Sequence, residues 1–149
     1  MSEPPGASPG VEEPFPHLRE MATSDPFAAH LGAELINPDP MCLQVALRIE
    51  AHHTNFMGLV HGGAVYSLAD IALSLISNAE VEAVALGTHL VQAASARIGD
   101  RLVATARPAT RSRSVATYQI TVERGDGKTI GMFTGTVFHR GDRPAGQAR

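Results

Sequence analysis

One carboxylate stands alone in a long apolar segment of this 149-residue chain. The segment starts at Gly62-Gly63 and runs to about residue 78, and Asp70 is its only charged side chain. On a helical wheel its polar side chains share an arc of roughly 80°: Ser67, Asp70, Ser74 and Ser77. An unpartnered buried carboxylate is costly, so this stripe must face a cleft, a partner surface or water. We expect Asp70 to act as a general base or nucleophile. A solvent-facing stripe or a structural acid bonded to loop backbone are the alternatives.

The paired glycines lie where this helix should begin. The first N–H groups of a helix have no internal partner and carry partial positive charge. Without a side chain at Gly62 or Gly63, a substrate carbonyl could approach them, and charge developing on its oxygen would be stabilised. Asp70 lies eight residues beyond Gly62, about 12 Å along the helix axis. That is too far to flank one small carbonyl, so the spacing suggests a site shared by two copies of the chain. A tight loop-to-helix turn is the alternative explanation of the glycines.

Composition excludes several classes of function. The net charge is -3 with acids and bases mixed, and no basic stripe points to nucleic acid. A single cysteine, Cys42, rules out a disulfide within the chain and disfavours a Cys-based zinc site. His52, His53 and His61 lack an acid or Cys that would complete a set of metal ligands, so we expect no metal.

The sequence also predicts the location of the protein. The first residues lack the pattern of a signal peptide, and no apolar run reaches ~18 residues, which predicts a cytoplasmic protein without a membrane partner.

The periodicity predicts one α+β domain over residues 17–140, between disordered segments at 1–16 and 141–149. Residues 25–31 suggest a short helix with Asp25 as its N-cap. Residues 41–50 alternate as a half-buried strand, and 62–78 form the one long helix. The remainder reads as one strand or two over about 84–96 and as strands over 101–110, 116–123 and 129–139, with a hairpin turn at 125–127. One long helix and one large antiparallel sheet suggest a sheet wrapped around the helix.

These residues resemble a known family. His53, Asn55, Gly58, His61-Gly62-Gly63 and Leu68-Ala69-Asp70 fit the pattern H-x-N-x-x-G-x-x-H-G-G-x-x-x-x-L-A-D of PaaI-type hotdog-fold thioesterases, which include phenylacetyl-CoA thioesterases of phenylacetate degradation. The resemblance extends over about residues 25–140. It implies a hotdog fold with a curled antiparallel sheet around one helix, dimers with two shared sites, and usually tetramers. It also implies an acyl-CoA substrate, with coenzyme A as part of that substrate and no separate cofactor.

The resemblance assigns roles to five residues. Asp70 matches the catalytic acid, and Gly62 matches the residue whose backbone N–H, supplied by the partner subunit, polarises the thioester carbonyl. Asn55 matches an asparagine that orients the thioester or water, and His61 matches a histidine that supports the loop holding Gly62. Ser74 stands where some relatives hold the attacking water with a hydroxyl.

Four more residues are candidates for substrate binding. Gly63 follows the polarising glycine, and Tyr66 could touch the acyl group, with core packing as its alternative. Arg111 and Arg113, in the turn before the strand at 116, are candidates for the coenzyme A phosphates, with a solvated turn as the alternative. Relatives often carry an aromatic residue and Arg-Pro in the stretch that reads THLVQAASARI here (88–98). The acyl group therefore stays open between phenylacetyl, related aryl and medium-chain groups.

Two rival functions fit the same residues. A catalytically silent acyl-CoA binding module would keep the fold and the ligand without turnover. A hotdog enoyl-CoA hydratase would need an acid and a histidine together on the substrate, which Asp70 and His61 would have to supply.

Overall fold

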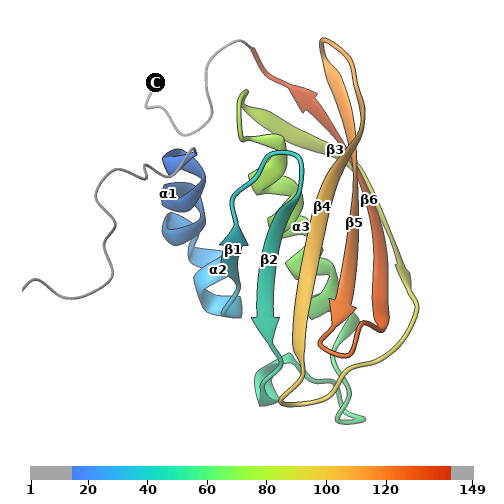
Figure 1. The fold of residues 1–149 in the computed structure, drawn as a ribbon. Helices are drawn as coiled ribbons and strands as arrows, with labels where there is room; N and C mark the ends of the chain where they lie inside the picture. Colours follow the sequence, from blue (N-terminus) through green and yellow to red (C-terminus); the bar gives the residue numbers. More distant parts are fainter. Residues whose placement is uncertain (1–14, 142–149) are drawn as a thin grey trace, which may run out of the picture.

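The computed structural model describes residues 15–141. Its elements in chain order are α1 (Pro16–Ser24), α2 (Pro26–Leu31), β1 (Glu34–Asn37), β2 (Leu43–Arg48), a 3-10 turn (Ala51–His53), α3 (Gly62–Ser77), β3 (Ala83–Gln92), β4 (Arg101–Arg111), β5 (Val115–Arg124) and β6 (Thr129–His139). The strands form one antiparallel sheet in the order β1-β2-β4-β5-β6-β3. The sheet curls around α3, and α1 and α2 lie beside the β1 edge (Figure 1). The predicted α+β hotdog architecture is confirmed.

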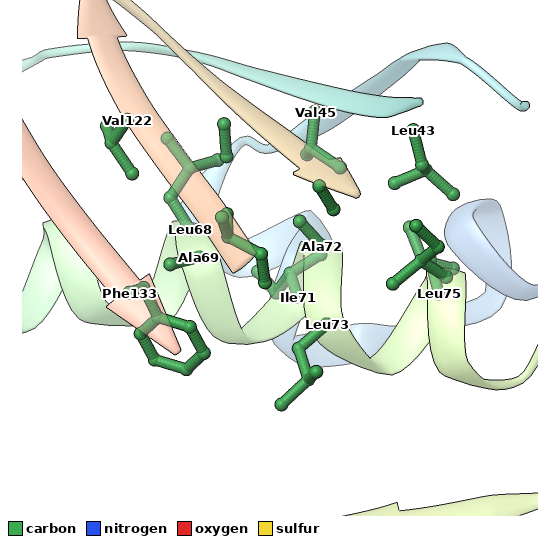
Figure 2. Packing of buried hydrophobic residues seen from close by; sticks show 14 of the residues in the cluster. Leu43, Val45, Leu68, Ala69, Ile71, Ala72, Leu73, Leu75, Val122 and Phe133 are labelled. Carbon is green, nitrogen blue, oxygen red and sulfur yellow. The ribbon is translucent and has the colours of Figure 1, made fainter. Parts of the chain in front are cut away.

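Burial on most sides explains why the α3 sequence is so apolar. Ten of its sixteen residues are buried, and Val65, Leu68, Ala69 and Ala72 have no exposed surface. In Figure 2, Leu68, Ala69 and Ala72 lie among side chains of the sheet strands, which include Val45, Val122 and Phe133. A helix enclosed in this way is stabilised mainly by apolar burial, at roughly 25 cal/mol per Å².

Two glycines of β6 let the helix approach the sheet. A Cβ on Gly135 would stand 2.5 Å from Leu73 Cδ2, and one on Gly131 would stand 3.1 Å from Val65 Cγ1. Real side chains do not pack as closely as 2.5 Å, so a side chain at position 135 would displace Leu73, whereas one at position 131 would only crowd Val65.

The N-terminal part contains one predicted and two unpredicted elements. Asp25 caps α2 as expected, with its carboxylate accepting from the N–H groups of Phe27 and Ala28. Helix α1 and strand β1 were not predicted from the sequence. Helix α1 begins at Pro16, one residue before the domain boundary predicted from the sequence. The disorder predicted for residues 1–14 and 142–149 lies outside the described residues.

Strand β2 is shorter than the predicted strand over 41–50. Leu43, Val45, Leu47 and the following Ile49 are buried as the alternation predicted. The alternation also put Met41 on the face of these residues, but Met41 precedes the strand and is 65% exposed, so that part of the prediction is wrong. The turn residue Asp39 accepts a hydrogen bond from the Met41 N–H, which places Met41 in the turn instead of the strand.

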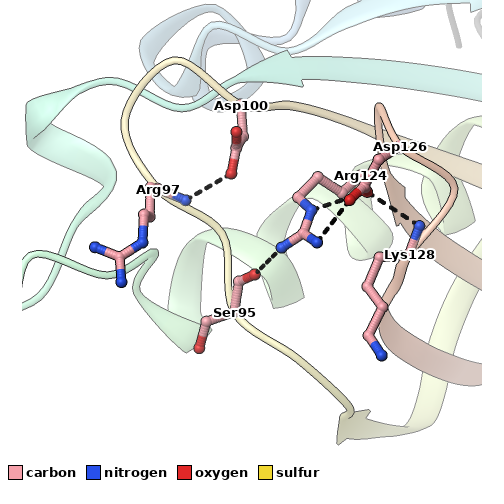
Figure 3. A network of polar contacts seen from close by, with 6 residues as sticks. All are labelled: Ser95, Arg97, Asp100, Arg124, Asp126 and Lys128. Atoms are coloured by element: carbon pink, nitrogen blue, oxygen red, sulfur yellow. Dashed lines mark hydrogen bonds and ion pairs between the residues drawn. The ribbon is translucent and has the colours of Figure 1, made fainter.

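A polar network holds the segment that follows β3 (Figure 3). The Arg124 guanidinium donates twice to the Asp126 carboxylate, at 2.9 and 2.8 Å, and once to the carbonyl of Ser95, at 3.0 Å. The Asp100 carboxylate accepts from the Arg97 N–H at 2.9 Å. The β5–β6 hairpin is thereby tied to the segment 93–100, which leads from the end of β3 into β4.

Candidate active site

The candidate site lies where the first half of α3 runs beside the edge strand β3. Two side-chain contacts join the elements: Tyr66 Oη lies 2.6 Å from Thr88 Oγ1, and Gln92 Nε2 donates to the carbonyl of Gly62 at 3.3 Å. Thr88 and Gln92 lie four residues apart on β3 and share a face, since side chains alternate along a strand. Asp70 follows Tyr66 by one helical turn, on the same side of α3.

Asp70 is a half-buried carboxylate without a partner. Its side chain has no hydrogen bond or ion pair within residues 15–141, and it is neither enclosed in the core nor fully exposed. Burial raises the pKa of Asp70 above its ordinary value of 3.8, because the charged form loses solvation and gains no compensating contact. These are the surroundings expected of a carboxylate that accepts a proton or attacks a substrate.

The start of α3 presents one unused N–H. His61 is the N-cap, and its Nδ1 accepts from the Gly63 N–H at 2.8 Å, which fixes the first turn. The N–H of Gly62 has no acceptor within the described part of the chain. Gly62 can therefore donate to a ligand, whereas the N–H of Gly63 is already used.

Asn55 shapes the loop that leads to this helix. Its Oδ1 accepts from the N–H groups of Met57 and Leu59, at 2.9 and 3.3 Å. Gly58 takes a φ of +75°, a conformation that side chains rarely adopt. The Asn55 amide nitrogen has no acceptor among residues 15–141, so it remains free to donate. Phe56, at the tip of this loop, is 97% exposed.

The other helical candidates differ in how far they are already engaged. The Ser74 hydroxyl is exposed and donates to the carbonyl of Ile71 at 2.9 Å, back onto its own helix. The Tyr66 ring packs edge-on against Phe133, with centroids 5.4 Å apart, while its hydroxyl reaches β3. Tyr66 thus has the packing role that the sequence offered as an alternative, while its contact with an acyl group stays a prediction.

The two arginine candidates lie at the far end of α3. Arg111 forms an ion pair with Glu80 at 3.1 Å, beyond the last residue of the helix. Arg111, Arg113 and His139 line a pocket of about 230 Å³. Fifteen residues separate Gly62 from Ser77, the last residue of α3, which is roughly 22 Å at the helical rise, and Glu80 lies beyond that end. The structure therefore does not bring the arginines together with the Gly62 end of the same chain.

The histidines form no metal site. His53 is buried, and its two ring nitrogens are engaged by the Glu50 N–H and the Leu31 carbonyl. Within residues 15–141 no group of three or more His, Cys, Asp or Glu side chains is placed to hold a metal ion. His61 lies nine residues from Asp70, roughly 13 Å along the helix, with Nδ1 occupied as the cap.

Sequence reasoning missed the two β3 residues of this site. Thr88 and Gln92 belong to β3, in which nearly every residue is exposed. The strand therefore lacks the alternation of apolar and polar residues that would distinguish its two faces. The available signal was the polar side chain at position 88 and at position 92, each two residues from Leu90 and so on the same face of a strand.

Comparisons with known proteins assign the family. Residues 57–130 match the Thioesterase superfamily. A curated protein of Deinococcus radiodurans is 38% identical over 135 residues, which make up 90% of this chain and 88% of that protein. A structure of an asparagine-to-aspartate variant of the phenylacetic acid degradation protein PaaI of Thermus thermophilus is 38% identical, with a TM-score of 0.75, and covers 77% of this chain and 99% of that one. The chain belongs to the PaaI-type hotdog-fold thioesterases.

A second relative extends the match over most of both chains. Acyl-coenzyme A thioesterase PaaI of Escherichia coli is 29% identical to the thioesterase over 129 residues, 86% of this chain and 92% of that protein. The structure of the E. coli PaaI protein gives a TM-score of 0.82 at 27% identity, covering 86% of this chain and 94% of that one. The thioesterase is accordingly a hydrolase of thioester bonds. None of the helices within residues 15–141 is long and apolar enough to cross a membrane.

Proposed function

We propose that this thioesterase hydrolyses an acyl-CoA, with Asp70 as the group that activates water or attacks the thioester. The observation that carries this proposal is the half-buried Asp70 carboxylate with no partner and a raised pKa. In one route Asp70 takes a proton from water as the water attacks the carbonyl carbon. In the other, Asp70 attacks first and water cleaves the resulting anhydride. Both routes consume one water and release a carboxylic acid and the thiol of coenzyme A.

The carbonyl oxygen needs a donor, and the partner subunit can supply it. Gly62 and Asp70 of one chain lie about 12 Å apart along α3, so they do not face one small group. A second copy places its own free Gly62 N–H against the first copy's Asp70. A donor of this kind contributes about 10²–10³-fold to kcat, because it stabilises the charge that develops on the oxygen.

The edge strand β3 supports a dimer. It is ten residues long and ends the sheet, and an unpaired edge is a template for another strand. Large apolar side chains lie exposed along it and on β6: Val84, Leu86, Val91, Met132 and Phe138. We propose that β3 pairs with the β3 of a second copy, which completes two sites. Two such dimers then form the tetramer.

Changing the edge tests this assembly. Leu86→Lys places a charge at a side chain that is 62% exposed in the single chain, and we expect it to produce monomers with little activity. Phe27→Lys is the matched control, since Phe27 is 55% exposed on α2, at the opposite side of the sheet. Light scattering reports the mass. A fully active wild-type monomer would contradict the shared site.

The remaining candidates fit supporting roles. Asn55 holds its loop through Oδ1 and offers its free amide nitrogen to the thioester or water. His61 fixes the turn that carries Gly62. Ser74 offers its hydroxyl oxygen to the attacking water one turn beyond Asp70. Arg111 and Arg113 hold the coenzyme A phosphates in the pocket that they share with His139.

The acyl group is proposed as phenylacetyl or a related aryl or medium-chain group. The E. coli relative is named for acyl-coenzyme A and the Thermus relative for phenylacetic acid degradation. Tyr66, 38% exposed beside Asp70, supplies an aromatic surface for such a group. A panel of phenylacetyl-, benzoyl-, hexanoyl- and acetyl-CoA, followed by thiol release, tests the ranking. The highest kcat/KM on acetyl-CoA would contradict an aryl or medium-chain preference.

The same assay separates the thioesterase from its rivals. A binding module would retain acyl-CoA without releasing thiol. A hydratase would add water to an enoyl-CoA and would need a histidine free to exchange a proton with it, but the Nδ1 of His61 is engaged as the helix cap. We therefore expect thiol release from saturated acyl-CoA and no hydration of crotonyl-CoA.

A further inference from the structure

The first turn of α3 offers only one outward N–H to a ligand. The Gly63 N–H donates to His61 Nδ1 at 2.8 Å. The N–H groups of Ala64 and Val65 donate to the His61 carbonyl at 2.9 and 3.4 Å. Within residues 15–141, only the Gly62 N–H of this turn lacks an acceptor. A second donor to the same substrate oxygen must therefore come from outside the helix.

The carboxamide of Gln92 lies beside that free N–H. Its Nε2 donates to the Gly62 carbonyl at 3.3 Å and stands 2.8 Å from where a Cβ on Gly62 would lie. The space that glycine leaves at position 62 is thus partly taken by Gln92. A primary amide carries two N–H bonds, and only one of them has an acceptor in the described part of the chain. Gln92 is exposed, so its second N–H can reach a ligand.

The backbone around Gln92 is held on both sides. Gln92 pairs with Gly131 of β6, and the next residue, Ala93, donates its N–H to the Ile130 carbonyl at 2.8 Å. Arg124 holds the carbonyl of Ser95 three residues beyond Gln92 (Figure 3). A side chain on such an anchored backbone is pre-positioned, and that is what makes a hydrogen-bond donor effective in catalysis.

We propose that Gln92 supplies the second hydrogen-bond donor to the thioester carbonyl, next to the Gly62 N–H. This inference rests on the proposed function. Nε2 keeps one hydrogen on the Gly62 carbonyl and directs the other at the oxygen that the Gly62 N–H meets. As the carbonyl carbon becomes tetrahedral, both donors share the negative charge on that oxygen. When the bond to sulfur breaks, the electron pair on that oxygen re-forms the carbonyl double bond and the negative charge leaves on the thiolate. Because Gln92 contacts Gly62 of its own chain, both donors reach the partner's site together.

Removing the second donor should act on kcat. We expect Gln92→Ala to lower kcat about 10²-fold while KM changes less than about threefold, since a donor to the developing charge acts in the transition state. Gln119→Ala is the matched control, because Gln119 is an exposed glutamine of β5 between the inward-facing Tyr118 and Ile120. Thermal unfolding and light scattering establish that each variant keeps its fold and its mass.

A pH profile separates donation from mere support of the fold. In Gln92→Glu the introduced carboxylate cannot donate, but it regains an O–H below a pKa of about 4.3. The ratio of variant to wild-type kcat should therefore rise as pH falls from 8 to 5. Taking the ratio cancels the protonation of Asp70, which both proteins share. Gln119→Glu should give a ratio near one throughout.

The possible outcomes distinguish this inference from the function on which it rests. Wild-type kcat in Gln92→Ala together with an inactive Asp70→Asn overturns the second donor and leaves the proposed function standing. A rise in KM alone also overturns it, because Gln92 would then bind ground state and transition state equally. An active Asp70→Asn removes the proposed function itself. A low kcat in Gln92→Ala and Gln92→Glu, with the pH-dependent ratio, supports the inference.

Discussion

Asp70 and Asp126 are two aspartates with opposite surroundings. Asp126 lies in the exposed β5–β6 turn and binds the Arg124 guanidinium through both oxygens, which lowers its pKa to about 2. Asp70 lies half-buried on α3 without any partner among residues 15–141, and burial raises its pKa. One carboxylate is held as an anion, and the other is left available to take up a proton.

The difference separates an acid that stabilises the fold from one that the fold merely tolerates. Asp126 compensates its charge on Arg124, and it thereby holds the guanidinium that bonds the Ser95 carbonyl in the segment after β3. Asp70 is desolvated with no compensation, so its ionised form lowers the stability of the folded state. Charged groups that lower the stability of the folded state often belong to functional sites, because activity requires them although stability does not.

The largest contrast is expected from neutralising each acid. Asp70→Asn should lower kcat by about 10²–10⁴-fold, the usual contribution of a general base, as measured by thiol release from the best acyl-CoA. Asp126→Asn should leave kcat unchanged. Equal activity of Asp70→Asn and wild type would show that this carboxylate takes no part in hydrolysis.

The polarising N–H can be removed with little change to the helix. Gly62 is the first residue of α3, where proline is tolerated, and His61 before it has a ψ of 134°, which suits a residue preceding proline. Gly62→Pro should therefore lower kcat about 10²–10³-fold. Gly62→Ala adds the same Cβ near Gln92 but keeps the N–H, and it is the control. An equal loss in both variants would assign the effect to crowding.

Activity should depend on the protonation of Asp70. Burial raises the pKa of Asp70 above 3.8, so the acid side of the kcat/KM profile should have its midpoint above pH 3.8. Below that midpoint, kcat/KM should fall tenfold for each pH unit.

The stability of the folded state should depend on the same proton in the opposite direction. The folded state holds this proton more tightly than the unfolded chain, so stability is lost as pH rises through the raised pKa, and Asp70→Asn should melt no lower than wild type at pH 7. A clearly lower melting temperature would indicate a structural acid.

The smallest effect is expected at Asp126. Its pKa of about 2 in the folded state lies below the usual ~3.9 of an unfolded chain. The stability it contributes is therefore present above pH ~4 and is lost as pH falls toward 2. The pair is exposed, so Asp126→Asn should lower the melting temperature only slightly at pH 7, and wild type and variant should converge near pH 2. A difference that persists at pH 2 would mean that the carboxylate acts through something other than its charge.

Local patterns predicted the elements whose signals lie within a few residues. The apolar run after Gly63 gave α3, the Asp25-Pro26 pair gave α2, and the alternation through Leu43 gave β2. The lone charge of Asp70 gave the main candidate of the site. Each signal is periodic or depends on neighbours in the sequence, so one chain suffices to detect it.

Contacts between distant residues could not be predicted in the same way. Strand β1 has four residues with only Leu35 buried, too short for a recognisable period. The hydrogen bond from Gln92 to Gly62 spans thirty residues and depends on how β3 pairs with β6 and lies along α3. Strand β3 is exposed on both faces in the single chain, so its sequence lacks the alternation that would have revealed Thr88 and Gln92.

Mixing two inactive variants examines whether one catalytic centre is built from two chains. Asp70→Asn and Gly62→Pro subunits, denatured together in equal amounts and refolded, should form mixed dimers with one intact site each. Random pairing then predicts about a quarter of wild-type thiol release, since half of the dimers are mixed and each of these has one of its two sites intact. If Asp70 and Gly62 of the same chain served one site, every site in the mixture would carry a defect, and activity no higher than that of the separate variants would contradict the shared centre.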